Sequence, residues 1–263
     1  MKQSHPSVIL MNFTGVYDYE AFARRRGMVH LDCTHLRGTE CYCDAGGAAA
    51  LRRLIAPYPP EGIHFIDSGD FHYLTKFWTD KLTRPFSLLV FDHHPDLQQP
   101  RYGGVLSCGG WVADVVRENP WVRQVCLGGV DRRLVAEVPA ELRPRVHFFC
   151  GDEGGYEAAC RNFSAGWLQG PVYLSIDKDV LSPREVRTNW DQGTMSLVAM
   201  EDVLRRVVER TPLLGADICG ECAATLDCFE EQREADGNSR VNSELLDLLL
   251  RAAGGPGLGA HCK

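Results

Sequence analysis

One stretch of sequence decides the predicted fold: Phe86-Ser87-Leu88-Leu89-Val90-Phe91-Asp92-His93-His94-Pro95-Asp96. Its apolar run shows no alternation, which is typical of a parallel strand buried on both faces. Open α/β sheets bind their ligands where such strands leave the sheet. Pro95 ends the strand, so Asp92, His94 and Asp96 fall on a loop, and their alternation predicts that they point to one side.

A second stretch repeats this design: Pro171-Val172-Tyr173-Leu174-Ser175-Ile176-Asp177-Lys178-Asp179-Val180-Leu181-Ser182-Pro183. An apolar strand again ends in alternating carboxylates, here Asp177 and Asp179. Acidic residues after a single strand often only cap a helix or satisfy loop backbone. Two strands with such endings favour a shared cation, because so many carboxylates repel one another without one.

Strand and helix signals alternate along the 263 residues. Apolar strands are predicted near residues 8, 28, 62, 86, 122, 145, 171 and 213. Helices are predicted between them, with Asp70 and Ser196 as N-caps and the last helix over 239–253. We therefore expect an α/β fold of three α/β/α layers with a mostly parallel sheet of about eight strands, in one domain over 1–263 with a flexible tail over 254–263.

Composition excludes several classes of partner. The formal net charge of −7 argues against nucleic acid or an anionic membrane as a main partner. No apolar stretch has the length of a membrane span, and residues 1–7 lack a signal-peptide core, so a cytoplasmic protein is expected. The eleven cysteines are predicted to be mostly reduced thiols. Cys219 and Cys222 form one C-x-x-C, for which inert thiols are favoured over a redox pair.

Two further stretches lie beside the predicted sheet edge. His72 falls in the first turn of a predicted helix, where it is either a sixth metal ligand or an ordinary surface histidine. The glycine-rich segment 103–110 lacks the Lys-Ser/Thr ending of a phosphate loop. It is predicted to let the backbone approach a substrate or the metals.

With these residues in view, the chain resembles the arginase (ureohydrolase) family. The family's Asp-x-His-x-Asp motif is matched by 92–96, and its Ser-x-Asp-x-Asp-x-x-x-Pro motif by 175–183. Its upstream Gly-Gly-Asp-His is matched more loosely by Gly69-Asp70-Phe71-His72, with one residue inserted.

The resemblance implies an arginase-like fold and a site with two Mn²⁺ ions per chain. In the family's pattern Asp92 and Asp177 bridge both ions, His72 and Asp96 complete one, and His94 and Asp179 complete the other. Carboxylate and imidazole ligands suit manganese. A hydroxide that bridges the two ions then attacks the planar carbon of a guanidino, amidino or formimino substrate and cleaves a linear C–N bond.

The sequence also departs from the family's pattern. The family's proton-shuttle histidine has no counterpart at Ser107-Cys108-Gly109, so His93 and Cys108 are the alternatives for proton transfer. Glu221 resembles the family's substrate-binding glutamate, displaced by one residue. Asp131 falls roughly where the family contacts an α-amino group, and Gln98 is a substitute for a group that binds a substrate carboxylate. These differences argue against arginine itself as the substrate.

Two other functions stay open at this point. The first is a zinc-dependent deacetylase-like amidohydrolase, a group that shares the fold and uses one metal with a His-His pair, for which His93-His94 is the candidate. The second is a non-catalytic metal-binding relative. The six potential ligands favour the manganese hydrolase, acting on a small molecule and possibly as a homo-oligomer.

Overall fold

The computed structural model describes residues 7–99, 103–150, 155–222 and 228–253, so the predicted tail over 254–263 lies outside the described residues. Eight strands form one sheet in the order β2-β1-β4-β10-β9-β5-β7-β8, and all of its pairings are parallel. The strands are β1 (Ser7–Asn12), β2 (Met28–Asp32), β4 (Gly62–Phe65), β5 (Phe86–Phe91), β7 (Val122–Gly128), β8 (Val146–Phe149), β9 (Val172–Asp177) and β10 (Leu213–Cys219). The predicted sheet is confirmed. Its continuity supports the expectation of a single domain, which stays a prediction.

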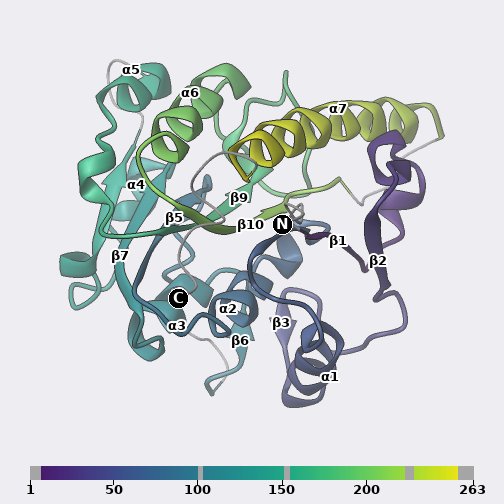
Figure 1. Ribbon diagram of the computed structural model, residues 1–263, viewed down its shortest axis with the longest axis horizontal. Helices are drawn as coiled ribbons and strands as arrows, with labels where there is room; N and C mark the ends of the chain where they lie inside the picture. The colour runs from purple at the N-terminus through teal and green to yellow at the C-terminus, as the bar shows by residue number, and fades with distance from the viewer. Residues whose placement is uncertain (1–6, 100–102, 151–154, 223–227, 254–263) are drawn as a thin grey trace, which may run out of the picture.

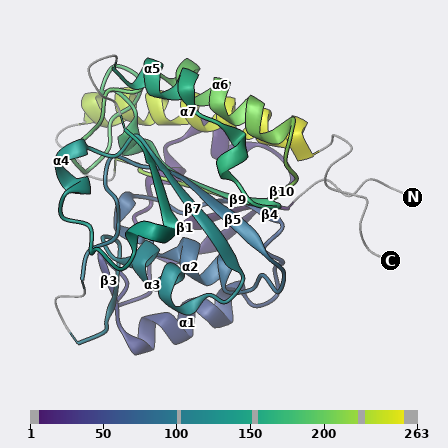
Figure 2. The same cartoon turned by 90° about the vertical axis from the view of Figure 1, so that its left-hand side faces the viewer.

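Helices cover both faces of this sheet (Figures 1 and 2). One face carries α1 (Ala45–Ile55), α2 (Leu74–Thr79) and α3 (Trp111–Glu118), and the other carries α5 (Gly155–Asn162), α6 (Leu197–Val208) and α7 (Cys228–Ala253). The single-turn helix α4 (Arg132–Val135) follows β7. The predicted three-layer architecture is therefore confirmed.

Strand β5 shows why an unbroken apolar run forms the centre of the sheet. All six of its residues are buried. Leu89 and Phe91 belong to the core under one helix layer, whereas Leu88 and Val90 belong to the core under the other. Because both faces are covered, the strand needs apolar side chains at every position. Its neighbour β9 is equally buried, so the acidic segments that follow both strands emerge side by side.

A small second sheet was not predicted. Strands β3 (Tyr42–Cys43) and β6 (Leu106–Ser107) pair antiparallel, although both lie in segments that the sequence assigns to loops. Two-residue strands carry too short a pattern for periodicity to reveal them. This sheet brings the glycine-rich segment over 103–110 next to the segment that precedes α1.

Two predicted helix starts are wrong. Asp70 is not an N-cap, since α2 begins after Tyr73, and the Asp70 carboxylate instead accepts hydrogen bonds from the Trp190 indole (3.1 Å) and the Cys41 thiol (3.0 Å). The last helix begins at residue 228 rather than 239. Lys178 donates to Asn238 (2.6 Å) and Asn242 (3.0 Å), one turn apart, which anchors the middle of α7. Ser196 does cap α6, accepting from the Ala199 amide at 3.2 Å.

None of the helices in the described ranges combines the length and the apolar character needed to cross a bilayer.

Candidate metal centre

The two acidic motifs form the same kind of turn at the ends of neighbouring strands. The Asp92 carboxylate, just after β5, accepts from the His94 amide at 2.6 Å. The Asp177 carboxylate, at the end of β9, accepts from the Asp179 amide at 3.0 Å. An aspartate that accepts from the amide two residues later forms an Asx-turn, which bends the chain back over the strand end. Both motifs are thereby folded toward one space.

A first group of ligand atoms surrounds His72. Its Nδ1 lies 3.2 Å from an oxygen of Asp92, 3.2 Å from an oxygen of Asp96 and 3.6 Å from an oxygen of Asp177. The ring is oriented by Ser175, whose hydroxyl lies 2.8 Å from Nε2. Only 1% of His72 is exposed, so the interpretation of it as a surface histidine is wrong.

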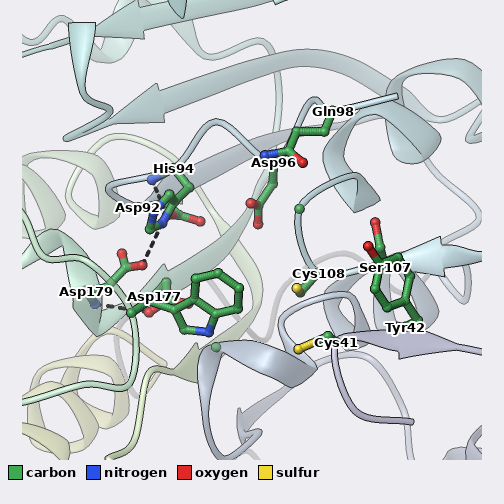
Figure 3. A pocket seen from close by; sticks show the side chains of 13 residues that line it. Cys41, Tyr42, Asp92, His94, Asp96, Gln98, Ser107, Cys108, Asp177 and Asp179 are labelled. Carbon is green, nitrogen blue, oxygen red and sulfur yellow. Dashed lines mark hydrogen bonds and ion pairs between the residues drawn. The ribbon is translucent and has the colours of Figure 1, made fainter. Parts of the chain in front are cut away.

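A second group is formed by Asp92, His94 and Asp179. His94 Nδ1 lies 2.8 Å from an Asp179 oxygen and 3.6 Å from an Asp92 oxygen. Figure 3 shows these side chains on the inner wall of the cavity. Asp92 belongs to both groups, so the six sequence-predicted ligands converge as two adjacent sets. We call these six residues, His72, Asp92, His94, Asp96, Asp177 and Asp179, the acidic cluster.

The loop over 92–96 is not extended as the alternation predicted. Asp96 has a left-handed backbone with φ of 49°, a conformation that aspartate tolerates better than most residues. Its carboxylate accepts from the Trp111 indole at 2.6 Å, and its carbonyl accepts from the Val112 amide at 3.1 Å. Asp96 is thus fixed by α3, and the two sets of ligands arise from a bend rather than from strand alternation.

The electrostatics of the acidic cluster favour a cation. Burial, together with the charges of Asp179 and Asp92, raises the pKa of Asp177 to about 7. Burial and the charge of Asp92 raise the pKa of Asp179 to about 6. Burial lowers the pKa of His94, but its bonds to Asp179 and Asp92 outweigh this and raise it to about 12. Burial and mutual repulsion therefore both disfavour the charged carboxylates, and a bound cation relieves both effects.

The donor atoms fit divalent cations. His72 Nδ1 is buried and makes no well-aligned hydrogen bond despite its short distances to three carboxylates. An imidazole nitrogen this close to three carboxylates can share a metal ion with them, and the hydrogen bond at Nε2 fixes the ring as in other metal sites. Oxygen and imidazole donors suit manganese and related divalent ions.

Cys219 is a member of the site that the sequence did not predict. Its buried thiol donates to Asp177 at 3.1 Å and lies within ligand distance of His72 and Asp177 as a third group. The register of the sheet explains this, because Cys219 pairs with Asp177 across β10 and β9. Cys222 instead donates to Glu234 at 3.2 Å, and the two cysteines of the C-x-x-C are not joined in a disulfide.

The acidic cluster lies at the base of a cavity of about 210 Å³. Cys41, Cys108 and Ser107 come from the β3–β6 sheet and its edges, and Figure 3 shows them opposite the aspartates. The described lining residues are Cys41, Tyr42, Gly69, Asp92, His94, Asp96, Gln98, Ser107, Cys108, Gly109, Asp177, Asp179 and Trp190. None of these is lysine or arginine, so the cavity is suited to a cationic rather than an anionic ligand.

Glu221 is not among these lining residues. It is fully buried, with an oxygen 2.6 Å from Lys178 Nζ and 2.8 Å from the Asn242 amide. The preceding residue, Gly220, has φ of 91°, and a Cβ there would lie 2.5 Å from an Asp177 oxygen. No side chain fits at Gly220, and the Glu221 side chain packs against Lys178 and Asn242 instead of lining the cavity. The placement does not support the predicted contact of Glu221 with substrate.

Glu221 belongs instead to a closed group of buried polar side chains next to the acidic cluster. Asn242 donates to both Glu221 and Glu20, the latter at 2.9 Å. Burial and the charge of Glu221 raise the pKa of Glu20 to about 10. We call this group the lysine cluster; its members are Lys178, Glu221, Glu20, Asn238 and Asn242.

The other two predicted catalytic residues also lie outside the cavity lining. Asp131 caps α4 and is paired with Arg133, whose guanidinium lowers the pKa of Asp131 to about 2. His93 is closer to the ligands, because its amide donates to Asp179 at 2.9 Å and its ring centroid lies 5.3 Å from that of His94. Burial and His94 lower the pKa of His93.

Comparisons with known proteins agree with this geometry. The model of the arginase family matches residues 62–235. The chain belongs to the arginase family. An uncharacterized protein of Thermotoga maritima is 34% identical over 189 residues, which are 72% of this chain and 68% of that protein.

Solved structures of arginase-family enzymes share the fold. Proclavaminate amidino hydrolase from Streptomyces clavuligerus is 17% identical with a TM-score of 0.63, over 96% of this chain and 95% of that chain. Trypanosoma cruzi formiminoglutamase with Mn²⁺ is 11% identical with a TM-score of 0.63, over the same shares of both chains. At these identities the likeness shows the fold alone, and the chain is a divergent member of its family.

Proposed function

We propose that this arginase-family chain is a hydrolase that uses two divalent cations, Mn²⁺ being the best suited, to cleave a linear C–N bond. The observation that carries the proposal is the pair of ligand groups that share Asp92 at the base of one cavity. His72 and Asp96 serve one ion, and His94 and Asp179 serve the other. Asp177, 3.6 Å from His72, is the second carboxylate that we assign to both ions. When bound, two such cations lower the pKa of a water molecule and supply hydroxide at neutral pH.

The cavity wall supports a planar cationic substrate. Trp190 is 41% exposed, and its indole is held by Asp70 at 3.1 Å with its ring 5.9 Å from that of His94. An aromatic face attracts a cation, and guanidinium or amidinium groups are both planar and positively charged. The described lining residues offer no cation for a substrate carboxylate. This favours guanidino, amidino or formimino compounds over a free amino acid such as arginine.

The chain's own polar groups orient the substrate in this proposal. Gln98, Ser107 and Tyr42 line the cavity and offer hydrogen-bonding groups to substrate nitrogens. For proton transfer we retain His93, which adjoins the ligand His94, and Cys108, which lines the cavity. Asp131 is paired with Arg133 outside the lining, and we assign it no contact with substrate. The cytoplasmic location and the homo-oligomer stay predictions.

The test combines metal analysis with a substrate screen. Protein purified without chelator is analysed for metal content and then assayed for release of urea, ammonia or free amine from guanidino, amidino and formimino compounds. Two manganese ions per chain and turnover of one such class are expected. One zinc per chain with deacetylation would favour the deacetylase-like function. Two bound metals without turnover of any class would favour the non-catalytic relative.

A further inference from the structure

Two cysteines face each other across the β3–β6 sheet. In this antiparallel pair Tyr42 is opposite Ser107 and Cys43 is opposite Leu106, so the next opposite pair is Cys41 and Cys108. The pairing continues there, because the Cys108 amide donates to the Cys41 carbonyl at 2.8 Å. Cys41 has a left-handed backbone (φ 54°) and lies just outside the regular ladder, in which directly opposite residues have Cα atoms about 4.5 to 5.5 Å apart. This spacing falls within the range that a disulfide requires, roughly 4.4 to 6.8 Å.

The two thiols also meet as side chains. Both side chains line the same cavity, and the neighbouring Cys41 thiol together with burial raises the pKa of the Cys108 thiol. Both cysteines are free in the structure. Their adjacent backbones meet the first geometric requirement for a disulfide, which is a short distance between the two Cα atoms.

Small reagents have access to this pair. Cys41 and Cys108 are partly exposed and line the cavity above the acidic cluster, and Figure 3 shows their sulfur atoms at its wall. Cys43, the neighbouring cysteine of the same strand, is buried, as are Cys33 and Cys126. Buried structural thiols are inert, whereas exposed thiols exchange with disulfides. Cys41 and Cys108 are therefore neighbours that small reagents can reach.

We propose that Cys41 and Cys108 form a redox-active pair that low-molecular-weight disulfides oxidise. One of the two thiols loses its proton to solvent and attacks a sulfur of the small disulfide, which releases one small thiol and leaves a mixed disulfide. The second thiol loses its proton and attacks the protein sulfur of that bond, which releases the second small thiol. The two cysteines are oxidised to a disulfide, and the small disulfide is reduced to two thiols.

The disulfide changes the cavity in a defined way. It removes the Cys41 thiol donor to Asp70, the carboxylate that also holds the Trp190 indole. It also ties together segments 41–43 and 106–108, which otherwise share a ladder of only two residue pairs. Such a cross-link stabilises the folded chain by restricting the unfolded one. The pair forms whether or not the chain is a hydrolase; only an effect on turnover depends on the proposed function.

Peptide mapping of the full chain tests the proposal. The reduced protein is equilibrated in glutathione buffers from reducing to oxidising, free thiols are alkylated, and the peptides are identified by mass spectrometry. A linked Cys41–Cys108 peptide is expected to replace the two alkylated peptides as the buffer becomes oxidising, with a higher melting temperature. Cys33, Cys43 and Cys126 are expected to remain reduced in all buffers, so they are alkylated once the protein is unfolded.

Single variants separate this pair from general thiol oxidation. Cys41→Ser and Cys108→Ser are each expected to hold one glutathione in a mixed disulfide at the remaining cysteine, with no rise in melting temperature. Cys126→Ser is the control and is expected to keep the linked peptide. Absence of the linked peptide from the wild-type protein across all buffers, or linkage of Cys41 to another cysteine, would overturn the proposal even if a serine variant fails to fold.

Discussion

Two groups of buried charges lie next to each other in this protein, and only one of them contains a lysine. The lysine cluster pairs Lys178 with Glu221 at 2.6 Å and holds Glu20 with a pKa raised to about 10 by burial and by Glu221. The acidic cluster brings four aspartates together with two histidines and opens to a cavity. The described residues that line this cavity include no lysine or arginine.

The difference shows that alternating residues of one motif have different roles: one stabilises the buried fold, and the others face the cavity. Asp177 and Asp179 face the cavity, whereas Lys178 between them is fully buried in the lysine cluster. One cluster is neutralised by the chain and closed to solvent. The other is left with an excess of negative charge beside a cavity, which is the condition under which metal ions from solution bind. Four predictions test this contrast, from the largest expected effect to the smallest.

Removing a shared carboxylate is expected to abolish the metal centre. In the proposed centre Asp92→Ala and Asp177→Ala lose both ions, whereas His94→Ala loses one. The metals supply several kcal/mol of transition-state stabilisation, so turnover is expected to fall on the order of 10³-fold or more in the aspartate variants. Metal analysis and steady-state assays measure both effects. Asp131→Asn is the control for metal content, since its carboxylate lies outside the cavity lining; equal content in all the variants would contradict the assignment.

Removing the internal cation is expected to destabilise the fold without touching the cavity. Lys178→Met leaves Glu221 as a buried carboxylate without its partner, which costs about 3 to 5 kcal/mol. The double variant with Glu221→Gln is expected to recover part of this loss, because no charge is then left unpaired. Urea unfolding measures the free energies. If Lys178→Met loses no more free energy of unfolding than a substitution of an exposed lysine, Lys178 does not neutralise Glu221 in the fold.

The thiol beside the metal ligands is expected to tune affinity. Cys219 donates to Asp177 at 3.1 Å, and loss of such an outer contact typically weakens metal binding about 10- to 100-fold. Cys219→Ala is therefore expected to raise the dissociation constant for Mn²⁺, measured by titration of the metal-free protein. Cys126→Ala removes another buried strand thiol, remote from the ligands, and is expected to bind as the wild type does. Equal affinities of the two variants would contradict a role for Cys219.

The smallest effect is expected from the neutral acid of the lysine cluster. The folded-state pKa of Glu20 is raised to about 10, above its unfolded value, so the native state binds a proton that the unfolded state releases. Stability is thus highest below the unfolded pKa and falls as pH rises toward 10. Glu20→Gln removes this dependence, so its free energy of unfolding is expected to decline less steeply between pH 5 and 8. If the free energy of unfolding of the wild type and of Glu20→Gln declines equally with pH, Glu20 is ionised in the folded protein.

The sequence was a sufficient guide where the relevant pattern is local. The apolar runs of β5 and β9, their Asx-turns and their Pro-closed ends are all contained in short segments, so the fold and the ligand motifs were predictable. Glu221 was not, because its direction depends on the space around Gly220 and on Lys178, which lies far away in the chain. The contacts of Cys219 and the β3–β6 sheet likewise depend on registers that no short pattern encodes.

The hydrogen-bonded pairing of β5 with β9 has a consequence for how the centre is assembled. Ser87 to Phe91 pair with Val172 to Ile176 without interruption, so the two ligand motifs begin one strand spacing apart, about 4.8 Å. Opening that distance requires breaking the middle of the sheet, whose amide protons exchange with solvent only when the whole fold opens. The ligands are therefore in place before metal binds. Metal-free protein is expected to keep these strands protected from deuterium, and metal is expected to add protection only by raising the overall stability.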